Sequence, residues 1–153
     1  PLYGDMSHRV MSLLSNFSPQ QEIYSIDECF LNLEGINVDL QLYGLQMKSR
    51  VEKGTGIPIS IGIAPTKALS KLANRIAKKF PIETGGSYVI DTDEKRIKAL
   101  KWLKVEDIWG VGRRNAKKLY AIGANKALDF VQLPESWVLK YMTIVGLNLQ
   151  KDL

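Results

Sequence analysis

The hydrophobic positions follow two periods along the chain, and the change of period predicts where helices give way to strands. Apolar residues recur at helical spacing over residues 2–17 and again over 40–51. Between these segments, residues 22–33 hold two β-prone runs of isoleucine, tyrosine, phenylalanine and leucine. A Ser-Pro pair ends the first helix and two glycines end the second. The first third of the chain is therefore predicted to be helix, hairpin and helix.

The remaining two thirds change from mixed to helical character. Residues 57–63 alternate isoleucine with smaller residues and predict a strand, and Pro65-Thr66 opens the helix that follows. A short strand over 87–90 comes next, and everything after it has helical spacing. The composition shifts over 81–86, so we expect a domain boundary there.

Two adjacent carboxylates, Asp27 and Glu28, interrupt the β-prone segment. Neighbouring residues on a strand point to opposite faces, so both can reach one site only if the chain bends there. Acids in an apolar segment are costly unless they are paired or bound to a cation, and Mg²⁺ prefers carboxylate oxygens. No third acid has a comparable setting, so the pattern predicts half of a magnesium site. The alternative is that Asp27 caps a turn and Glu28 is a surface residue.

The helix after Pro65-Thr66 has one strongly basic face. Lys67, Lys71, Arg75 and Lys78 follow one another at intervals of three or four residues, opposite the apolar face. A row of cations repels itself, and a bound phosphate would supply the missing counter-charge. The alternative is an outer face that only increases solubility.

A glycine-rich turn, Gly110-Val111-Gly112, precedes the most basic predicted helix. The cations behind it are Arg113, Arg114, Lys117 and Lys118. This pattern is typical of a helix-hairpin-helix, in which two glycines let the turn approach a DNA backbone and the next helix directs its N–H groups at a phosphate. The alternative is an αα-hairpin whose glycines only allow tight packing.

The charge distribution supports a polyanionic partner. The 153 residues carry a net charge of +5, with +9 in residues 67–126 and −4 in the remainder. An ordinary lysine-rich surface would give the same totals.

No apolar run approaches the roughly 20 residues needed to cross a bilayer. A single cysteine, Cys29, excludes an internal disulfide, and a chain that starts at Pro1 is expected to be a fragment.

Four motifs together resemble one protein family over nearly the whole chain. They are Tyr24-Ser25-Ile26-Asp27-Glu28, Gly62-Ile63-Ala64-Pro65-Thr66-Lys67, Lys71-Leu72-Ala73-Asn74 and Trp109-Gly110-Val111-Gly112-Arg113-Arg114. They resemble the Y-family translesion DNA polymerases, and within that family the UmuC type, the catalytic subunit of bacterial DNA polymerase V.

The resemblance implies an α+β fold and assigns roles to the candidate residues. Residues 1–82 would be the later part of the palm, an antiparallel sheet with helices on one face, and residues 83–153 an all-α thumb with a helix-hairpin-helix. Asp27 and Glu28 would be catalytic carboxylates holding two Mg²⁺ ions. Lys71, assisted by Lys67, would bind the nucleotide triphosphate. The DNA backbone would be bound by the hairpin and the cations behind it, namely Gly110, Val111, Gly112, Arg113, Arg114 and Lys117.

The resemblance also implies an activity and partners. The full-length protein would be an error-prone polymerase in SOS mutagenesis and DNA damage tolerance, taking primer–template DNA and deoxynucleoside triphosphates. A UmuD′-like subunit, RecA and the sliding clamp would be its partners, in the cytoplasm and at the nucleoid, with no membrane involved.

This segment alone is expected to be inactive. The family's first metal-binding aspartate, steric gate and fingers lie before the matched motifs, and the little finger lies after them. Without its first strand, the palm part is expected to fold imperfectly, pair with another chain or rearrange. Two alternatives remain: a non-catalytic helix-hairpin-helix DNA-binding module, and an interaction subunit that keeps the fold without the chemistry.

Overall fold

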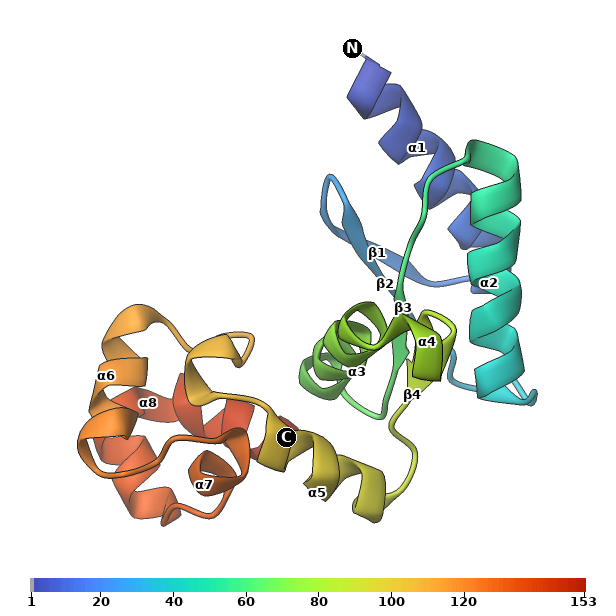
Figure 1. Ribbon diagram of the computed structural model, residues 1–153. Coiled ribbons are helices and arrows are strands. Elements are labelled where there is room, and N and C mark those ends of the chain that lie inside the picture. The colour runs from blue at the N-terminus through green and yellow to red at the C-terminus, as the bar shows by residue number, and fades with distance from the viewer. Residues whose placement is uncertain (1) are drawn as a thin grey trace. The chain divides into compact units, whose positions relative to one another are not determined.

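The computed structural model describes the backbone of residues 2–153 and the side chains of residues 4–153 (Figure 1). The α+β class is confirmed, but the expected antiparallel sheet over residues 1–82 is wrong, because the described strands form two separate two-stranded sheets, one antiparallel and one parallel. The structure forms two compact units: the first contains the chain up to Ile61 together with Ala77–Tyr88, and the second contains Gly62–Ile76 and Val89–Leu153.

Helices α1 and α2 form the core of the first unit. Methionine and valine side chains from both helices are buried where they pack together, among them Val10, Met11, Met47 and Val51. The Tyr43 hydroxyl donates to the carbonyl of Phe17 at 2.5 Å, which fixes the end of the first helical segment against α2. The elements of this unit are α1 (Leu2–Leu14), the 3-10 turn η1 (Ser15–Phe17), β1 (Gln21–Ser25), β2 (Glu28–Leu31), α2 (Leu40–Thr55) and α4 (Pro81–Thr84).

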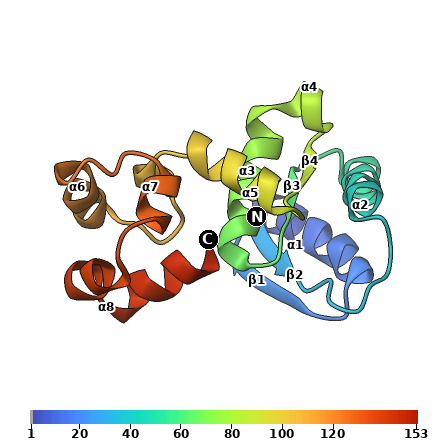
Figure 2. The same ribbon diagram turned by 90° about the horizontal axis from the view of Figure 1, so that it is seen from below.

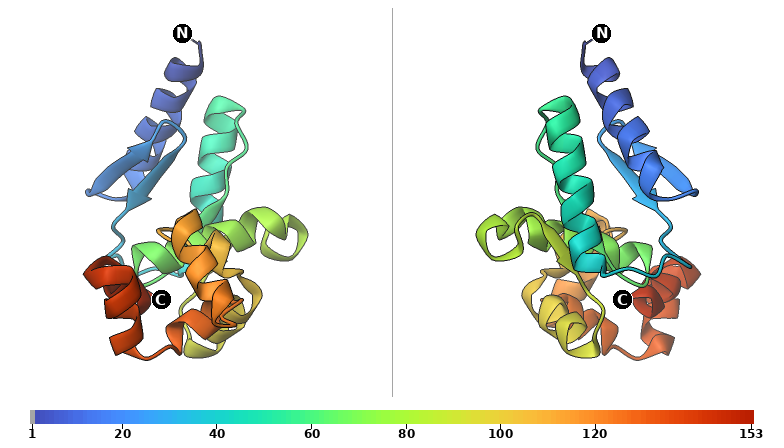
Figure 3. Two further views of the ribbon diagram at one scale, coloured as in Figure 1. Left: turned by 90° about the vertical axis from the view of Figure 1, so that its left-hand side faces the viewer. Right: turned by 90° about the vertical axis from the view of Figure 1, so that its right-hand side faces the viewer.

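The predicted acidic hairpin is confirmed. Strands β1 and β2 pair antiparallel across the two-residue turn Ile26-Asp27 (Figure 3). The register shifts between Ile23 and Ser25, so Tyr24 is the extra residue of a β-bulge. The bulge and the turn supply the bend that the two adjacent carboxylates require.

The second sheet is a strand–helix–strand unit made of β3 (Ile61–Ile63), α3 (Lys67–Lys79) and β4 (Ser87–Val89). Ile61 N–H donates to the Gly86 carbonyl, and Ile90 N–H to the Ile63 carbonyl, so residue numbers rise together in the two strands as in a parallel pair. The predicted strand over 57–63 is wrong at its start, because β3 begins only at Ile61. In the segment before it, the carbonyl of Ile59 accepts a hydrogen bond from the Lys48 ammonium at 2.5 Å.

Gly62 lets β3 lie directly against the backbone of α3. A Cβ built on Gly62 would come within 2.1 Å of the Asn74 nitrogen and 2.4 Å of the Ser70 oxygen. Distances this short are impossible for a real side chain, and both neighbours are backbone atoms of a helix, which cannot move aside. The glycine therefore sets the distance between strand and helix.

The second unit continues as a cluster of helices around one core (Figure 2). Leu100, Val105, Leu119, Phe130 and Val138 are completely buried in it. These helical elements confirm the prediction that the chain after residue 90 is helical. They are α5 (Asp93–Trp102), η2 (Val105–Asp107), α6 (Arg113–Ala121), α7 (Ala127–Val131) and α8 (Glu135–Asp152).

Two details of these helices concern their caps and their course. Thr92 is the N-cap of α5, because its hydroxyl accepts from the Lys95 N–H, and Asp93 is the first helical residue. Helix α8 is kinked at Thr143, where φ is 66° and ψ −174°. A threonine with positive φ is strained, and nothing in the local sequence announces it.

Replacing Gly62 by alanine should destabilise the chain strongly. The added methyl group would force β3 away from α3, at a cost of about 1–3 kcal/mol or more in the free energy of unfolding. Urea unfolding followed by circular dichroism measures it. The control is Gly4→Ala, because Gly4 lies in α1 with no neighbour within 4 Å of an added Cβ. Equal midpoints for the two variants would contradict this account of the packing.

Candidate functional site

The acidic pair lies at the tip of the hairpin. Asp27 is the second residue of the turn and is exposed, while Glu28 begins β2 and is half-buried. Glu28 pairs in register with Ser25 on the opposite strand. The sequence placed both carboxylates at a bend, and the structure confirms that location.

Two serines hold the turn. The Ser7 hydroxyl on α1 donates to the carbonyl of Ile26, and the Ser25 hydroxyl donates to Asp27 Oδ1 at 2.8 Å. Ser7 is 19 residues away from its partner, so no local pattern in the sequence indicates this contact. Through this hydrogen bond, α1 fixes the position of the carboxylate-bearing turn.

The donor set partly fits a magnesium site. Asp27 and Glu28 offer carboxylate oxygens from neighbouring positions, one of them exposed, which suits a hard cation that keeps other ligands such as water or phosphate. Among residues 4–153, no three acidic, histidine or cysteine side chains gather as a metal cage. The pair can therefore supply two ligands and requires the remainder from a substrate or from outside this group.

Cys29 follows the acidic pair without joining its chemistry. Burial raises the pKa of the Cys29 thiol, and Gln21 donates a weak hydrogen bond to its sulfur at 3.6 Å. A thiol with a raised pKa stays protonated near neutral pH and is a poor nucleophile. Cys29 is thus a packing residue.

The basic face of α3 includes an ion pair within the second unit. Thr66 caps the helix, since its Oγ1 accepts from the Leu69 N–H at 3.1 Å. Lys67 is exposed and Lys71 half-buried on the first turns. Arg75 Nη2 lies 3.3 Å from Asp107 Oδ2 in η2. At least this member of the basic row therefore has protein counter-charge, which the sequence pattern did not predict.

The glycine turn between η2 and α6 is buried on both sides of Gly110 and has open space at Gly112. Gly110 has a φ of 94°, which requires glycine, while Ile108 and Val111 are buried and joined by a 3.0 Å hydrogen bond from the Val111 N–H. Gly112 is the N-cap of α6, with ordinary φ and open space where a side chain would be.

Exposed cations surround the start of α6. Arg113, Arg114 and Lys117 are all exposed, and the first-turn N–H groups of a helix have no partner within the helix. Together with the positive end of the helix dipole, they form a surface suited to phosphate groups.

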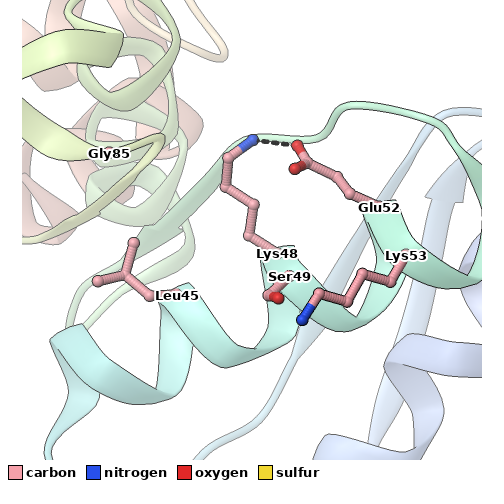
Figure 4. A pocket seen from close by; sticks show the side chains of 6 residues that line it. All are labelled: Leu45, Lys48, Ser49, Glu52, Lys53 and Gly85. Atoms are coloured by element: carbon pink, nitrogen blue, oxygen red, sulfur yellow. Dashed lines mark hydrogen bonds and ion pairs between the residues drawn. The ribbon is translucent and has the colours of Figure 1, made fainter.

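One shallow pocket, of about 380 Å³, lies in the first unit and includes none of these residues (Figure 4). It is lined by Leu45, Lys48, Ser49, Glu52, Lys53 and Gly85. Lys48 forms an ion pair with Glu52 and also binds a backbone carbonyl, and its hydrogen bond lowers the pKa of Glu52. Two of the polar groups that line the pocket, those of Lys48 and Glu52, are thus already paired with each other.

The candidate residues are divided between the two units. Asp27 and Glu28 belong to the first unit, whereas Lys67, Lys71 and the glycine turn belong to the second. No helix in residues 2–153 is long and apolar enough to cross a membrane.

The sequence is similar to that of known proteins along most of the chain. Residues 1–75 match the impB/mucB/samB family. The protein UmuC of Salmonella typhimurium is 43% identical over 141 residues, which cover 91% of this chain and 33% of the relative. The protein ImpB of Salmonella typhimurium is 40% identical over 149 residues, covering 94% of this chain and 35% of the relative. The chain thus spans about a third of the length of the curated relatives it matches.

The same likeness holds in three dimensions. The insertion ternary complex of Dbh DNA polymerase superimposes with a TM-score of 0.77 at 25% identity, covering 99% of this chain and 44% of that chain. The sequence relatives and the structural neighbours lead to the same family. The chain therefore belongs to the impB/mucB/samB family and is related to the Y-family DNA polymerases of the UmuC type, as its motifs indicated.

Proposed function

We propose that this chain is a segment of an error-prone translesion DNA polymerase acting in SOS mutagenesis and DNA damage tolerance. The 43% identity to UmuC extends over 91% of the chain and supports this most directly. In this proposal residues 1–82 are the later part of the palm, and residues 83–153 are a thumb with a helix-hairpin-helix. Primer–template DNA and deoxynucleoside triphosphates are the substrates.

The acidic pair and the basic face of α3 have different roles in nucleotidyl transfer. Asp27 and Glu28 would hold Mg²⁺ at the tip of a turn that Ser7 and Ser25 fix in place. When bound, Mg²⁺ stabilises the charge on the attacking and leaving oxygens of the transfer. Lys71, assisted by Lys67, binds the triphosphate by charge-assisted hydrogen bonds.

The glycine turn binds DNA without reading its sequence. Gly110, Val111 and Gly112 bring the backbone close to a phosphate, and Arg113, Arg114 and Lys117 add positive charge. Backbone contacts of this kind suit a polymerase that must act on any template. A UmuD′-like subunit, RecA and a sliding clamp are the partners that the family relationship suggests, in the cytoplasm and at the nucleoid.

Removing either carboxylate should abolish catalysis and spare DNA binding. In the full-length protein, we expect Asp27→Ala or Glu28→Ala to lower primer extension by about 10³-fold, because charge stabilisation of the transferring phosphoryl group is lost. Extension assays and DNA binding are measured side by side, with Glu34→Ala, an exposed acid beyond the hairpin, as control. Retained extension together with lost DNA binding would refute the assignment.

Lys71→Ala should act on the nucleotide. Loss of a charge-assisted hydrogen bond to the triphosphate should raise the nucleotide KM about tenfold or more. The control is Lys98→Ala, an exposed helical lysine of α5. An unchanged KM would remove Lys71 from the triphosphate site.

The glycine turn can be tested with the 153-residue chain itself. Binding to a labelled primer–template duplex across a salt series should give a log–log slope of roughly −2 to −4, as expected for a few phosphate contacts. Gly112→Val should lose most of the affinity while keeping the fold, since Gly112 has a φ of −81° and nothing near an added Cβ. Equal binding by both proteins would mean that the basic helix binds polyanions unspecifically and that the glycine turn does not contact DNA.

A further inference from the structure

Residues on both sides of Lys67 and Lys71 link helix α3 to other elements of the second unit, namely α8 and η2. Before them, the Thr66 hydroxyl donates to the carbonyl of Asp152, near the end of α8, at 2.6 Å. After them, Arg75 forms its 3.3 Å ion pair with Asp107. All of these residues belong to the second compact unit, which takes in α3 as far as Ile76.

The ion pair joins the two phosphate-binding elements by a short path. Arg75 lies one turn beyond Lys71 on the same face of α3, and Asp107 lies three residues before Gly110. The turn η2 that carries Asp107 is itself firmly held. Val105 is completely buried there, and its N–H donates to the Asn125 carbonyl at 3.0 Å. Asp107 therefore connects the segment before the glycine turn with α3.

We infer that Arg75 and Asp107 are positioning residues that couple the DNA-binding turn to the triphosphate-binding lysines. This inference rests on the proposed function. DNA bound at Gly110-Val111-Gly112 would hold η2, and through the ion pair α3, in the position that Lys71 needs. Coupling of two binding sites is reciprocal, so nucleotide binding would tighten DNA binding by the same factor.

Charge alone makes a different prediction from positioning. Asp107 puts a negative charge close to a DNA-binding turn, so simple electrostatics predicts that its removal strengthens DNA binding and leaves the nucleotide site unaffected. Positioning predicts that the nucleotide KM rises and that nucleotide no longer tightens DNA binding. The two effects are therefore separable in one set of variants.

The experiment compares Asp107→Asn, Arg75→Gln and the double variant in the full-length protein. The side chains are 51% and 32% exposed, so the pair is partly screened and each single variant should raise the nucleotide KM about two- to fivefold with kcat unchanged. The double variant should be no worse than either single variant, because both lose the same contact. Arg75→Lys should restore most of the loss, since it keeps the charge.

Asp93→Asn is the matched control. It breaks the 2.9 Å ion pair with Arg96, whose two members lie three residues apart within α5. Arg96 keeps its separate 2.8 Å hydrogen bond to the Leu153 carbonyl, which does not involve Asp93. The dissociation constant of primer–template DNA is measured with and without a non-hydrolysable nucleotide. In the wild type and the control, the nucleotide should tighten DNA binding, and this effect should shrink in Asp107→Asn and Arg75→Gln.

Three outcomes would overturn the inference. They are a KM equal to that of Asp93→Asn, additive effects in the double variant, and an undiminished effect of nucleotide on DNA binding. Failure of the proposed function is recognised separately, because Asp27→Ala would then leave extension intact. Melting temperatures of all variants exclude general unfolding as the cause of a raised KM.

Discussion

The contact between Gly62 and the backbone of α3 is the constraint on which the candidate nucleotide site depends. Because position 62 has no side chain, the strand approaches the helix at Ser70 and Asn74, and Lys71 lies between these two residues. The helix is then capped by Thr66 and fastened by Arg75. The placement of the basic face thus follows from backbone packing on the neighbouring side of the helix, where a single methyl group would not fit.

Local patterns in the sequence predicted the elements that carry the candidate chemistry. The alternation around Asp27, the helical spacing from Lys67 to Lys79 and the glycines at 110 and 112 each depend on neighbours a few residues apart. For the same reason their structural locations agree with the prediction. The turn at 26–27, helix α3 and the N-cap at Gly112 lie where the sequence indicated.

Interactions between distant residues could not be predicted in this way. Ser7 is 19 residues from Ile26, and Arg75 is paired with an aspartate in another element. A row of cations looks the same whether its counter-charge is a ligand or a carboxylate from elsewhere in the fold. The start of β3 was misjudged for a related reason, since a lysine from α2 binds the carbonyl of Ile59. Side-chain contacts of this kind leave no periodic signal.

The hairpin has a further consequence for handling the protein. Ile23, Tyr24 and Ile26 are 62%, 49% and 52% exposed, although their composition is that of a buried strand. Apolar side chains on a short two-stranded hairpin favour strand-to-strand pairing between molecules. The tendency of the protein to aggregate will therefore depend on whether another surface covers these three residues. Self-association through this hairpin should therefore increase with protein concentration.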